Sequence, residues 1–178
     1  AFLEHDILPL IPEEGSVGAS GDLTPLSYVA ATLSGEREVL FHGERRQAAD
    51  VHRELGWTPL VLRPKEALAL MNGTAVMTAL ACQAYARADY LLKLATRITA
   101  LNVVALQGNP EHFDERLFAA KPHPGQMQVA AWIRSDLAID APTAPLHRLQ
   151  DRYSLRCAPH VLGVLADSLG LLRQFIET

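Results

Sequence analysis

The sequence predicts a mainly α-helical fold built around one very long helix. Apolar residues recur at helical spacing through most of the chain, and the longest periodic stretch covers residues 64–106. Alanine and leucine, both strong helix formers, fill many of its positions. Only residues 39–44 have the pattern of a short hairpin or extended pair. We therefore expect helices to form the core and strands to play a minor part.

The first third of the chain is expected to alternate loops with short helices. Residues 1–21 are rich in proline and glycine and predict a loop that starts with a short helical turn. A helix is predicted over 23–33, with Asp22 available to cap its start and Gly35 to end it. A small amphipathic helix is predicted over 47–55.

The long periodic stretch is expected to break near Asn72-Gly73, because a polar residue and a glycine interrupt an otherwise apolar pattern. The part from Thr74 to Leu106 then exceeds about 30 residues, which makes a rod of roughly 45 Å. Apolar residues are spread widely around this rod, so it needs neighbours on several sides. We infer a helical bundle within a larger assembly.

The last third is expected to hold two more helices. Gly108-Asn109-Pro110 ends the long helix, and the proline-rich segment 122–125 marks a second polar interval. Helices are predicted over 126–137 and 159–176, with a connection over 138–152. No internal repeat is visible.

The composition is that of a globular protein. Of the 178 residues, 49% are hydrophobic and 20% are charged, and a chain of this length is expected to form one domain. The formal charge of -4 and the absence of a dense Lys/Arg run exclude an extended nucleic-acid surface. Charges such as Arg87, Asp89 and Lys93 interrupt the apolar runs, so we expect no membrane-spanning segment.

The two cysteines, Cys82 and Cys157, are too few for a disulfide framework or a zinc pattern. We therefore expect a reducing cytoplasm and no metal. The chain starts at Ala1 without a methionine or a signal-peptide pattern, so it is expected to be a piece of a longer protein.

The segment Ala19-Ser20-Gly21-Asp22 can carry unusual chemistry. Glycine has no Cβ, so the Gly21 nitrogen can approach the Ala19 carbonyl and close a five-membered ring. Loss of two waters, one of them from Ser20, then gives an exocyclic methylidene conjugated with the ring, which is a strong electrophile. The alternative for so short a motif is a flexible turn in which Asp22 caps the next helix.

Two other segments are candidates for polar function. Asn72 in the segment 70–75 is either a helix C-cap or a residue with a specific hydrogen-bonding task. In the segment 150–160, Arg156 can grip a carboxylate through two parallel hydrogen bonds, although such a segment can equally be a solvated loop. The histidines, His112 and His123 among them, lack clustered metal ligands and are expected to be surface or packing residues.

The stretch from Gly15 to Tyr28 resembles the signature of the histidine, phenylalanine and tyrosine ammonia-lyases and the related aminomutases. That resemblance implies that Ala19, Ser20 and Gly21 form the 4-methylideneimidazol-5-one group, MIO, with Asp22 assisting closure. The segments at 70–75 and 150–160 also resemble this family, which implies that Asn72 and Gln150 join the hydrogen-bond network around MIO and substrate. It further implies that Tyr153 orders the MIO surroundings and that Arg156 binds the substrate carboxylate. Where many relatives have Pro-Gln, this chain has Pro159-His160, so no role is carried over to His160.

The resemblance implies a bundle of long helices of the ammonia-lyase (fumarase/aspartase-like) type, with a loop region that carries the MIO triplet. Residues 1–178 would be the central segment of a lyase of about 500 residues that acts as a homotetramer, with three subunits building each active site. The substrate amine, or its aromatic ring in another proposal, would add to the methylidene. A tyrosine outside this chain would remove the β-proton, and ammonia would leave a trans-arylacrylate. The segment by itself is expected to be inactive.

The substrate is expected to be an aromatic L-amino acid. The segment 24–28 and Ala75 resemble phenylalanine or tyrosine enzymes, whereas the segment 153–157 resembles histidine enzymes, which make urocanate. We favour phenylalanine or tyrosine, and an aromatic aminomutase shares the same motifs. The alternative from another class is an inactive helical assembly module that kept the motifs.

Overall fold

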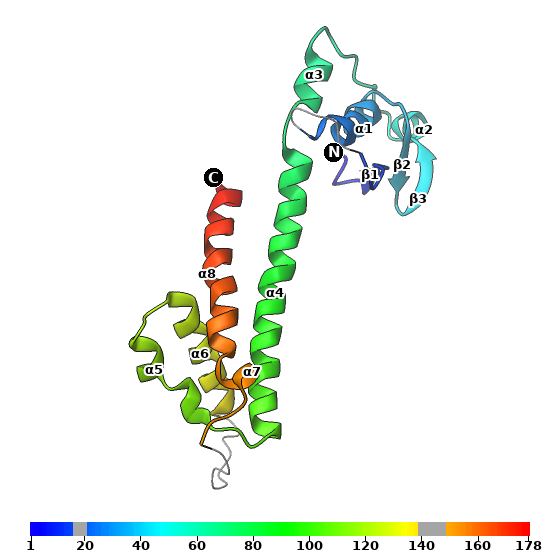
Figure 1. Cartoon of the computed structure of the whole chain (residues 1–178). Coiled ribbons are helices and arrows are strands. Elements are labelled where there is room, and N and C mark those ends of the chain that lie inside the picture. The colour runs from blue at the N-terminus through cyan, green and yellow to red at the C-terminus, as the bar shows by residue number, and fades with distance from the viewer. Residues whose placement is uncertain (16–20, 139–148) are drawn as a thin grey trace. The chain divides into compact units, whose positions relative to one another are not determined.

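The computed structural model describes residues 1–15, 21–138 and 149–178 (Figure 1). The chain forms two compact units, Ala1–Leu80 (unit 1) and Ala81–Thr178 (unit 2). The boundary lies inside the long helix α4 (Ala75–Ala105). Each unit has its own cluster of buried apolar residues. The length of the chain predicted one domain, but length limits the size of a core and not the number of cores.

Unit 1 contains a small antiparallel sheet in the order β1 (Ile7–Pro9), β2 (Glu38–Phe41), β3 (Glu44–Gln47). The turn between β2 and β3 places His42 and Gly43 at φ of 49° and 83°, as a tight hairpin requires. The predicted hairpin is therefore confirmed. β1 was not expected, because three residues ending in proline give no alternating pattern.

Unit 1 also contains the short helices α1 (Leu23–Leu33), α2 (Ala48–Glu54) and α3 (Glu66–Met71), together with the start of α4. The predicted bounds of α1 are confirmed, and Gly35 at φ 78° follows its end. The core of the unit joins the sheet to α2 through Ile7, Val39, Phe41, Ala48 and Val51.

Helix α4 has 31 residues, and it begins after a break at residues 72–74, as the Asn72-Gly73 pair predicted. At about 1.5 Å per residue it is roughly 46 Å long. Its buried residues are Leu92, Thr96, Ala100 and Val103, all in unit 2.

Unit 2 adds a 3-10 turn η1 (Pro110–Phe113) and helices α5 (Glu115–Ala119), α6 (Pro124–Leu137), α7 (Tyr153–Arg156) and α8 (Ala158–Glu177). Helices α6 and α8 lie side by side (Figure 1). The predicted helices over 126–137 and 159–176 are confirmed within two residues at each end. The core is formed by Leu92, Ala100, Val103, Phe113, Val129, Ile133, Leu137, Leu155 and Leu169.

The 3-10 turn η1 and the short helix α5 were not predicted. Each starts at a side-chain cap, with Asn109 Oδ1 accepting from the Glu111 N–H and Asp114 Oδ1 accepting from the Arg116 N–H. Elements of four and five residues are too short to show helical periodicity.

Glycines allow α6 and α8 to approach closely. A Cβ on Gly125 would lie 2.1 Å from the Gly163 carbonyl oxygen, and a Cβ on Gly163 would lie 2.5 Å from the Gln126 nitrogen. Asp167 on α8 also accepts a 2.7 Å hydrogen bond from the Gly125 N–H, at the first turn of α6. The contact between these helices therefore depends on small residues and on one carboxylate cap.

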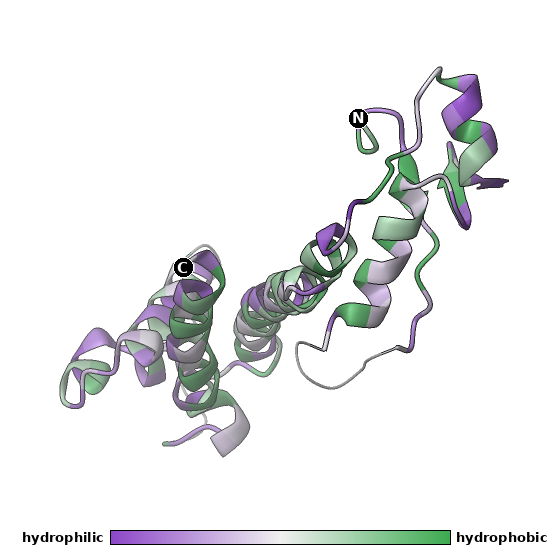
Figure 2. Ribbon diagram, turned by 90° about the horizontal axis from the view of Figure 1, so that it is seen from above, coloured by the Kyte–Doolittle hydropathy of each residue, from purple (hydrophilic) through white to green (hydrophobic). Residues whose placement is uncertain are grey.

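Large apolar residues remain exposed along α4 and α8, and Figure 2 shows apolar residues recurring along α8. By length and composition alone, the helical stretches Glu66–Ala105 and Tyr153–Glu177 could cross a membrane, a test that core helices of soluble proteins also pass. The expectation that charges interrupt every apolar run was therefore too strong, since residues 67–86 carry no charge. The break at residues 72–74 nevertheless divides that run between α3 and α4.

Candidate functional site

The MIO triplet is only partly covered by the structure. Ala19 and Ser20 lie outside the described residues. Gly21 is described and adopts φ 80°, in the left-handed region where residues with a side chain are strained. The third position of the triplet thus has a backbone conformation that suits glycine.

Asp22 connects the triplet to the start of α4. Its side chain is buried, with 5% exposed, and its Oδ2 accepts hydrogen bonds from the Val76 N–H at 2.9 Å and the Met77 N–H at 3.0 Å. These N–H groups belong to the first turn of α4, which has no carbonyl partners for them and carries the positive end of the helix dipole. Asp22 does not cap its own helix, because α1 has no side-chain cap bond. The predicted cap on α1 was wrong, and the carboxylate caps a helix 54 residues away.

Asn72 lies at the same junction. It is the C-cap residue of α3, where its N–H donates to the Leu68 carbonyl at 2.9 Å, and its side chain is exposed. The C-cap interpretation is therefore confirmed for its backbone. Within unit 1, Asp22 holds the turn of α4 that begins three residues after Asn72, so the first two motifs meet at one helix junction.

The third motif lies in unit 2, at the start of α7. Gln150 and Tyr153 are exposed, and Arg156 is half-buried with its guanidinium carbon 5.4 Å from the centre of the Tyr153 ring. Arg156 Nη1 donates to the Cys157 sulfur at 3.5 Å. Its Nε is buried and has no hydrogen-bond partner among the described residues. An unpaired donor on a charged group is costly unless a ligand or another chain completes it.

A cluster of residues that no sequence pattern indicated holds this motif in place. Asp151 Oδ2 accepts a 2.6 Å hydrogen bond from the Asn109 N–H, and the Asp151 N–H donates to His112 Nε2 at 3.0 Å. His112 was expected to be a surface or packing residue, but it forms a specific hydrogen bond across 39 residues of sequence. No periodicity or motif in the sequence relates these two positions.

His160, to which no role was carried over, is an exposed residue of α8. Its ring lies 5.3 Å from the ring of Phe118 on α5, centroid to centroid. It therefore packs against an aromatic neighbour.

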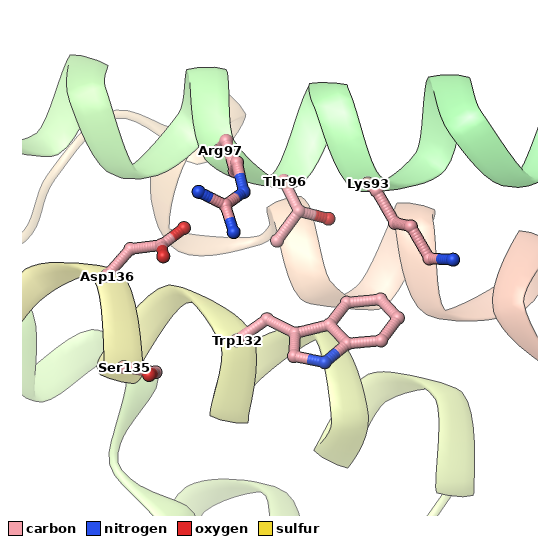
Figure 3. Close-up of a pocket in the computed structure, with 6 residues that line it drawn as sticks. All are labelled: Lys93, Thr96, Arg97, Trp132, Ser135 and Asp136. Atoms are coloured by element: carbon pink, nitrogen blue, oxygen red, sulfur yellow. The ribbon is translucent and has the colours of Figure 1, made fainter.

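A cavity of about 310 Å³ lies between α4 and α6 in unit 2 (Figure 3). Arg97 from α4 and Asp136 from α6 point toward each other across it, and the Trp132 indole lies along it. None of the predicted site residues that the structure describes is among the residues that line this cavity. Among the described residues, no group of three His, Cys, Asp or Glu side chains could hold a metal ion.

The whole chain, residues 1–178, matches the family model described as aromatic amino acid lyase. It is 43% identical to the histidine ammonia-lyase of Bacillus subtilis over 180 residues, which covers 99% of this chain and 35% of that enzyme. The chain thus spans about a third of the length of the curated relatives it matches.

Solved structures of related enzymes have the same fold. The phenylalanine aminomutase of Pantoea agglomerans aligns with a TM-score of 0.89 at 31% identity, covering 98% of this chain and 37% of that one. The phenylalanine ammonia-lyase of Rhodosporidium toruloides aligns with a TM-score of 0.85 at 39% identity, covering 94% of this chain and 26% of that one. The long helices are therefore those of the ammonia-lyase fold. From the match over its full length, the chain belongs to the aromatic amino acid lyase family, whose members are carbon–nitrogen lyases.

Proposed function

We propose that the protein containing this segment eliminates ammonia from an aromatic L-amino acid, without oxidation, and releases a trans-arylacrylate. The observation that carries this proposal is the family match over residues 1–178, which includes the triplet, Asn72 and Arg156. Because the chain covers 35% of its Bacillus subtilis relative, the activity is proposed for the longer protein and not for the segment alone.

The triplet Ala19-Ser20-Gly21 is proposed to form MIO, and the described residues around it fit this group. Gly21 has a backbone conformation suited to glycine, and buried Asp22 fixes the chain immediately after the triplet to the first turn of α4. We propose that Asp22 assists ring closure from this fixed position. The group supplies an electrophilic carbon that makes the substrate nitrogen a better leaving group. It needs no metal.

Arg156 is proposed to bind the substrate carboxylate. Its half-buried guanidinium has a buried Nε without a partner among the described residues, so a carboxylate would satisfy that donor and neutralise the charge. The Tyr153 ring lies 5.4 Å from the guanidinium carbon, at cation–π distance, and Tyr153 is proposed to order the MIO surroundings. Exposed Gln150 and Asn72 are proposed to complete the hydrogen bonds to substrate and MIO when the subunits assemble.

Two substrate classes remain candidates. Residues 24–28 and Ala75 favour phenylalanine or tyrosine. Residues 153–157 and the 43% identity to a histidine ammonia-lyase favour histidine, which would give urocanate. An aminomutase, which returns the ammonia to the β-carbon, is the related alternative, since a phenylalanine aminomutase has the same fold. Product analysis with all three amino acids distinguishes these activities.

The protein is proposed to be a cytoplasmic homotetramer. Large apolar side chains are exposed on both long helices, among them Leu91 at 57% and Leu101 at 68% on α4 and Phe175 at 71% on α8. Neither unit buries them by itself, so they favour contacts with further protein surface. Second copies of the same chain would bury these faces and could bring the motifs of different subunits together. The alternative is an inactive helical assembly module, which would also form oligomers but would not contain MIO.

The test is Ser20→Ala in the full-length protein. Alanine has no hydroxyl to lose, so the methylidene cannot form, and turnover of phenylalanine, tyrosine and histidine should be abolished while the oligomer persists. Arylacrylate absorbance measures the first effect and light scattering the second. A purified Ser20→Ala protein with near wild-type turnover would overturn the proposal.

A further inference from the structure

Asp151 attaches the segment that carries Tyr153 and Arg156 to the loop after α4. Its backbone N–H donates to His112 Nε2 at 3.0 Å, and its Oδ2 accepts from the Asn109 N–H at 2.6 Å. The Asp151 side chain is 10% exposed and that of His112 is 16% exposed, so both bonds are shielded from water. We refer to Asn109, His112 and Asp151 as the bracket.

Gly108, in the loop after α4, allows the Asp151 carboxylate to come close to the backbone. A Cβ on Gly108 would lie 2.8 Å from Asp151 Oδ2 and 3.2 Å from Val103 Cγ1, so a side chain at this position would push the carboxylate away. Asn109 is itself fixed, because its Oδ1 accepts from the Glu111 N–H at the start of η1. The bracket therefore joins the start of η1 to the residues immediately before α7.

His112 takes part in the bracket through one ring nitrogen. Its Nε2 accepts the hydrogen bond that the backbone N–H of Asp151 donates. The distance from His112 Nε2 to Asp151 Oδ2 is 3.8 Å, which is too long for a hydrogen bond. In this geometry His112 acts as the hydrogen-bond acceptor for the Asp151 backbone.

The bracket lies on the N-terminal side of α7. Leu149 is 92% exposed and Gln150 is also exposed, whereas Asp151 is held by its two hydrogen bonds. On the other side, Leu155 packs into the core of unit 2. Arg156 follows directly, so its position depends on both attachments of this short helix.

We propose that His112 is a positioning residue for Arg156 and acts through the backbone of Asp151. This proposal rests on the proposed carboxylate-binding role of Arg156. Loss of the acceptor at position 112 would free the Asp151 N–H, loosen the start of α7 and move the guanidinium away from the substrate carboxylate. The chemistry at the amino group would be less affected, because His112 touches neither substrate nor triplet in this proposal.

The experiment compares His112→Leu with His112→Gln in the full-length enzyme. Leucine fills similar space but accepts no hydrogen bond, whereas glutamine Oε1 reaches about as far as Nε2 and can accept from Asp151. We expect His112→Leu to raise KM about tenfold with a smaller change in kcat, and His112→Gln to stay within about twofold of wild type. Equal kinetics of the two variants would overturn the proposal.

A double-mutant cycle separates this proposal from the proposed function. In an Arg156→Ala background, where the guanidinium is already gone, His112→Leu should cause no further loss of kcat/KM. If Arg156→Ala retains wild-type kinetics, the carboxylate role itself fails. If Arg156→Ala is impaired and His112→Leu adds its full effect on top, the positioning role fails while the carboxylate role stands.

A second variant covers the case in which His112→Leu does not fold. Gly108→Ala disturbs the bracket from the other side, through the contact with Asp151 Oδ2. We expect the same raised KM and the same lack of effect in the Arg156→Ala background. Wild-type KM in a folded Gly108→Ala enzyme would contradict the proposal.

Discussion

Removal of the Asp22 carboxylate should loosen the first turn of α4. Asp22→Ala leaves the N–H groups of Val76 and Met77, now bonded at 2.9 and 3.0 Å, without an acceptor. Loss of a helix cap costs about 0.5–2 kcal/mol, and a hydrogen bond to a charged group contributes about 1.5–3 kcal/mol. Because Asp22 is only 5% exposed, solvent replaces it poorly, and we expect a loss of about 2 kcal/mol.

Amide hydrogen exchange of the full-length protein measures this loss locally. A decrease of about 2 kcal/mol in the free energy of local opening corresponds to about 30-fold faster exchange at the first turn of α4. The comparison is best made in a Ser20→Ala background, because no ring can then form and any effect of Asp22 on cyclisation is removed. Asp22→Asn keeps an acceptor oxygen and serves as the matched control, with a smaller acceleration.

The outcome that refutes this reasoning is specific. If residues 75–80 exchange at the same rate in Asp22→Ala and in its Asp22 parent, the carboxylate does not stabilise the start of α4. Faster exchange spread evenly over unit 2 would also contradict it, since the two hydrogen bonds lie in unit 1.

Three further predictions concern the other contacts. Arg156→Ala in the full-length enzyme should reduce kcat/KM by a factor equivalent to at least about 2 kcal/mol. Arg156→Lys should recover only part of the lost kcat/KM, because lysine cannot make the two parallel hydrogen bonds to a carboxylate. Wild-type kcat/KM in the alanine variant would exclude the carboxylate-binding role. Gly163→Ala should lower the free energy of unfolding by about 1–3 kcal/mol, because the new Cβ meets the backbone of α6. Gly170→Ala is the control and should leave the stability unchanged, because the space around Gly170 is open. Thermal unfolding compares the two variants. The hydrogen bond from Arg116 lowers the pKa of Asp114 from 3.8 to about 2. Because the folded state favours the ionised carboxylate, the contribution of Asp114 to folding stability is present above pH 3.8 and is lost as the pH falls through about 2. Arg116→Ala should return the pKa of Asp114 towards 3.8, which a carboxyl NMR titration measures.

Local patterns predicted the helices well. The bounds of α1, the break at Asn72-Gly73 and the length of α4 follow from periodicity, capping residues and glycine positions, which act over a few neighbouring residues. Strand β1, the 3-10 turn η1 and the short helix α5 were not predicted, because they are too short to show a periodicity and none is marked by a hairpin turn as β2 and β3 are.

The long-range polar contacts could not be predicted from the sequence. Asp22, Asp151 and Asp167 each accept a hydrogen bond from a backbone N–H at least 42 residues away. Every residue except proline has a backbone N–H that can serve as the donor, so neither the type nor the spacing of residues identifies the partner. The sequence therefore indicated Asp22 as a candidate residue but not the helix that its carboxylate caps.

The candidate site residues were chosen by motif, and the structure adds their local settings. The Arg156 Nε, which has no partner within residues 1–15, 21–138 and 149–178, and the helix junction held by Asp22 emerge only when the chain is folded. Asn72 belongs to unit 1 and Arg156 to unit 2, so the roles proposed for them in one active site remain predictions for the assembled enzyme.

The most direct test of the central claim is the intact mass of the purified full-length protein. If the triplet cyclises, the mass is lower than the sequence mass by two waters, about 36 Da, and the deficit lies in the peptide that contains Ala19-Ser20-Gly21. We predict this deficit in the wild-type protein. An unmodified mass in a freshly purified, folded oligomer would contradict the assignment of a MIO-dependent lyase.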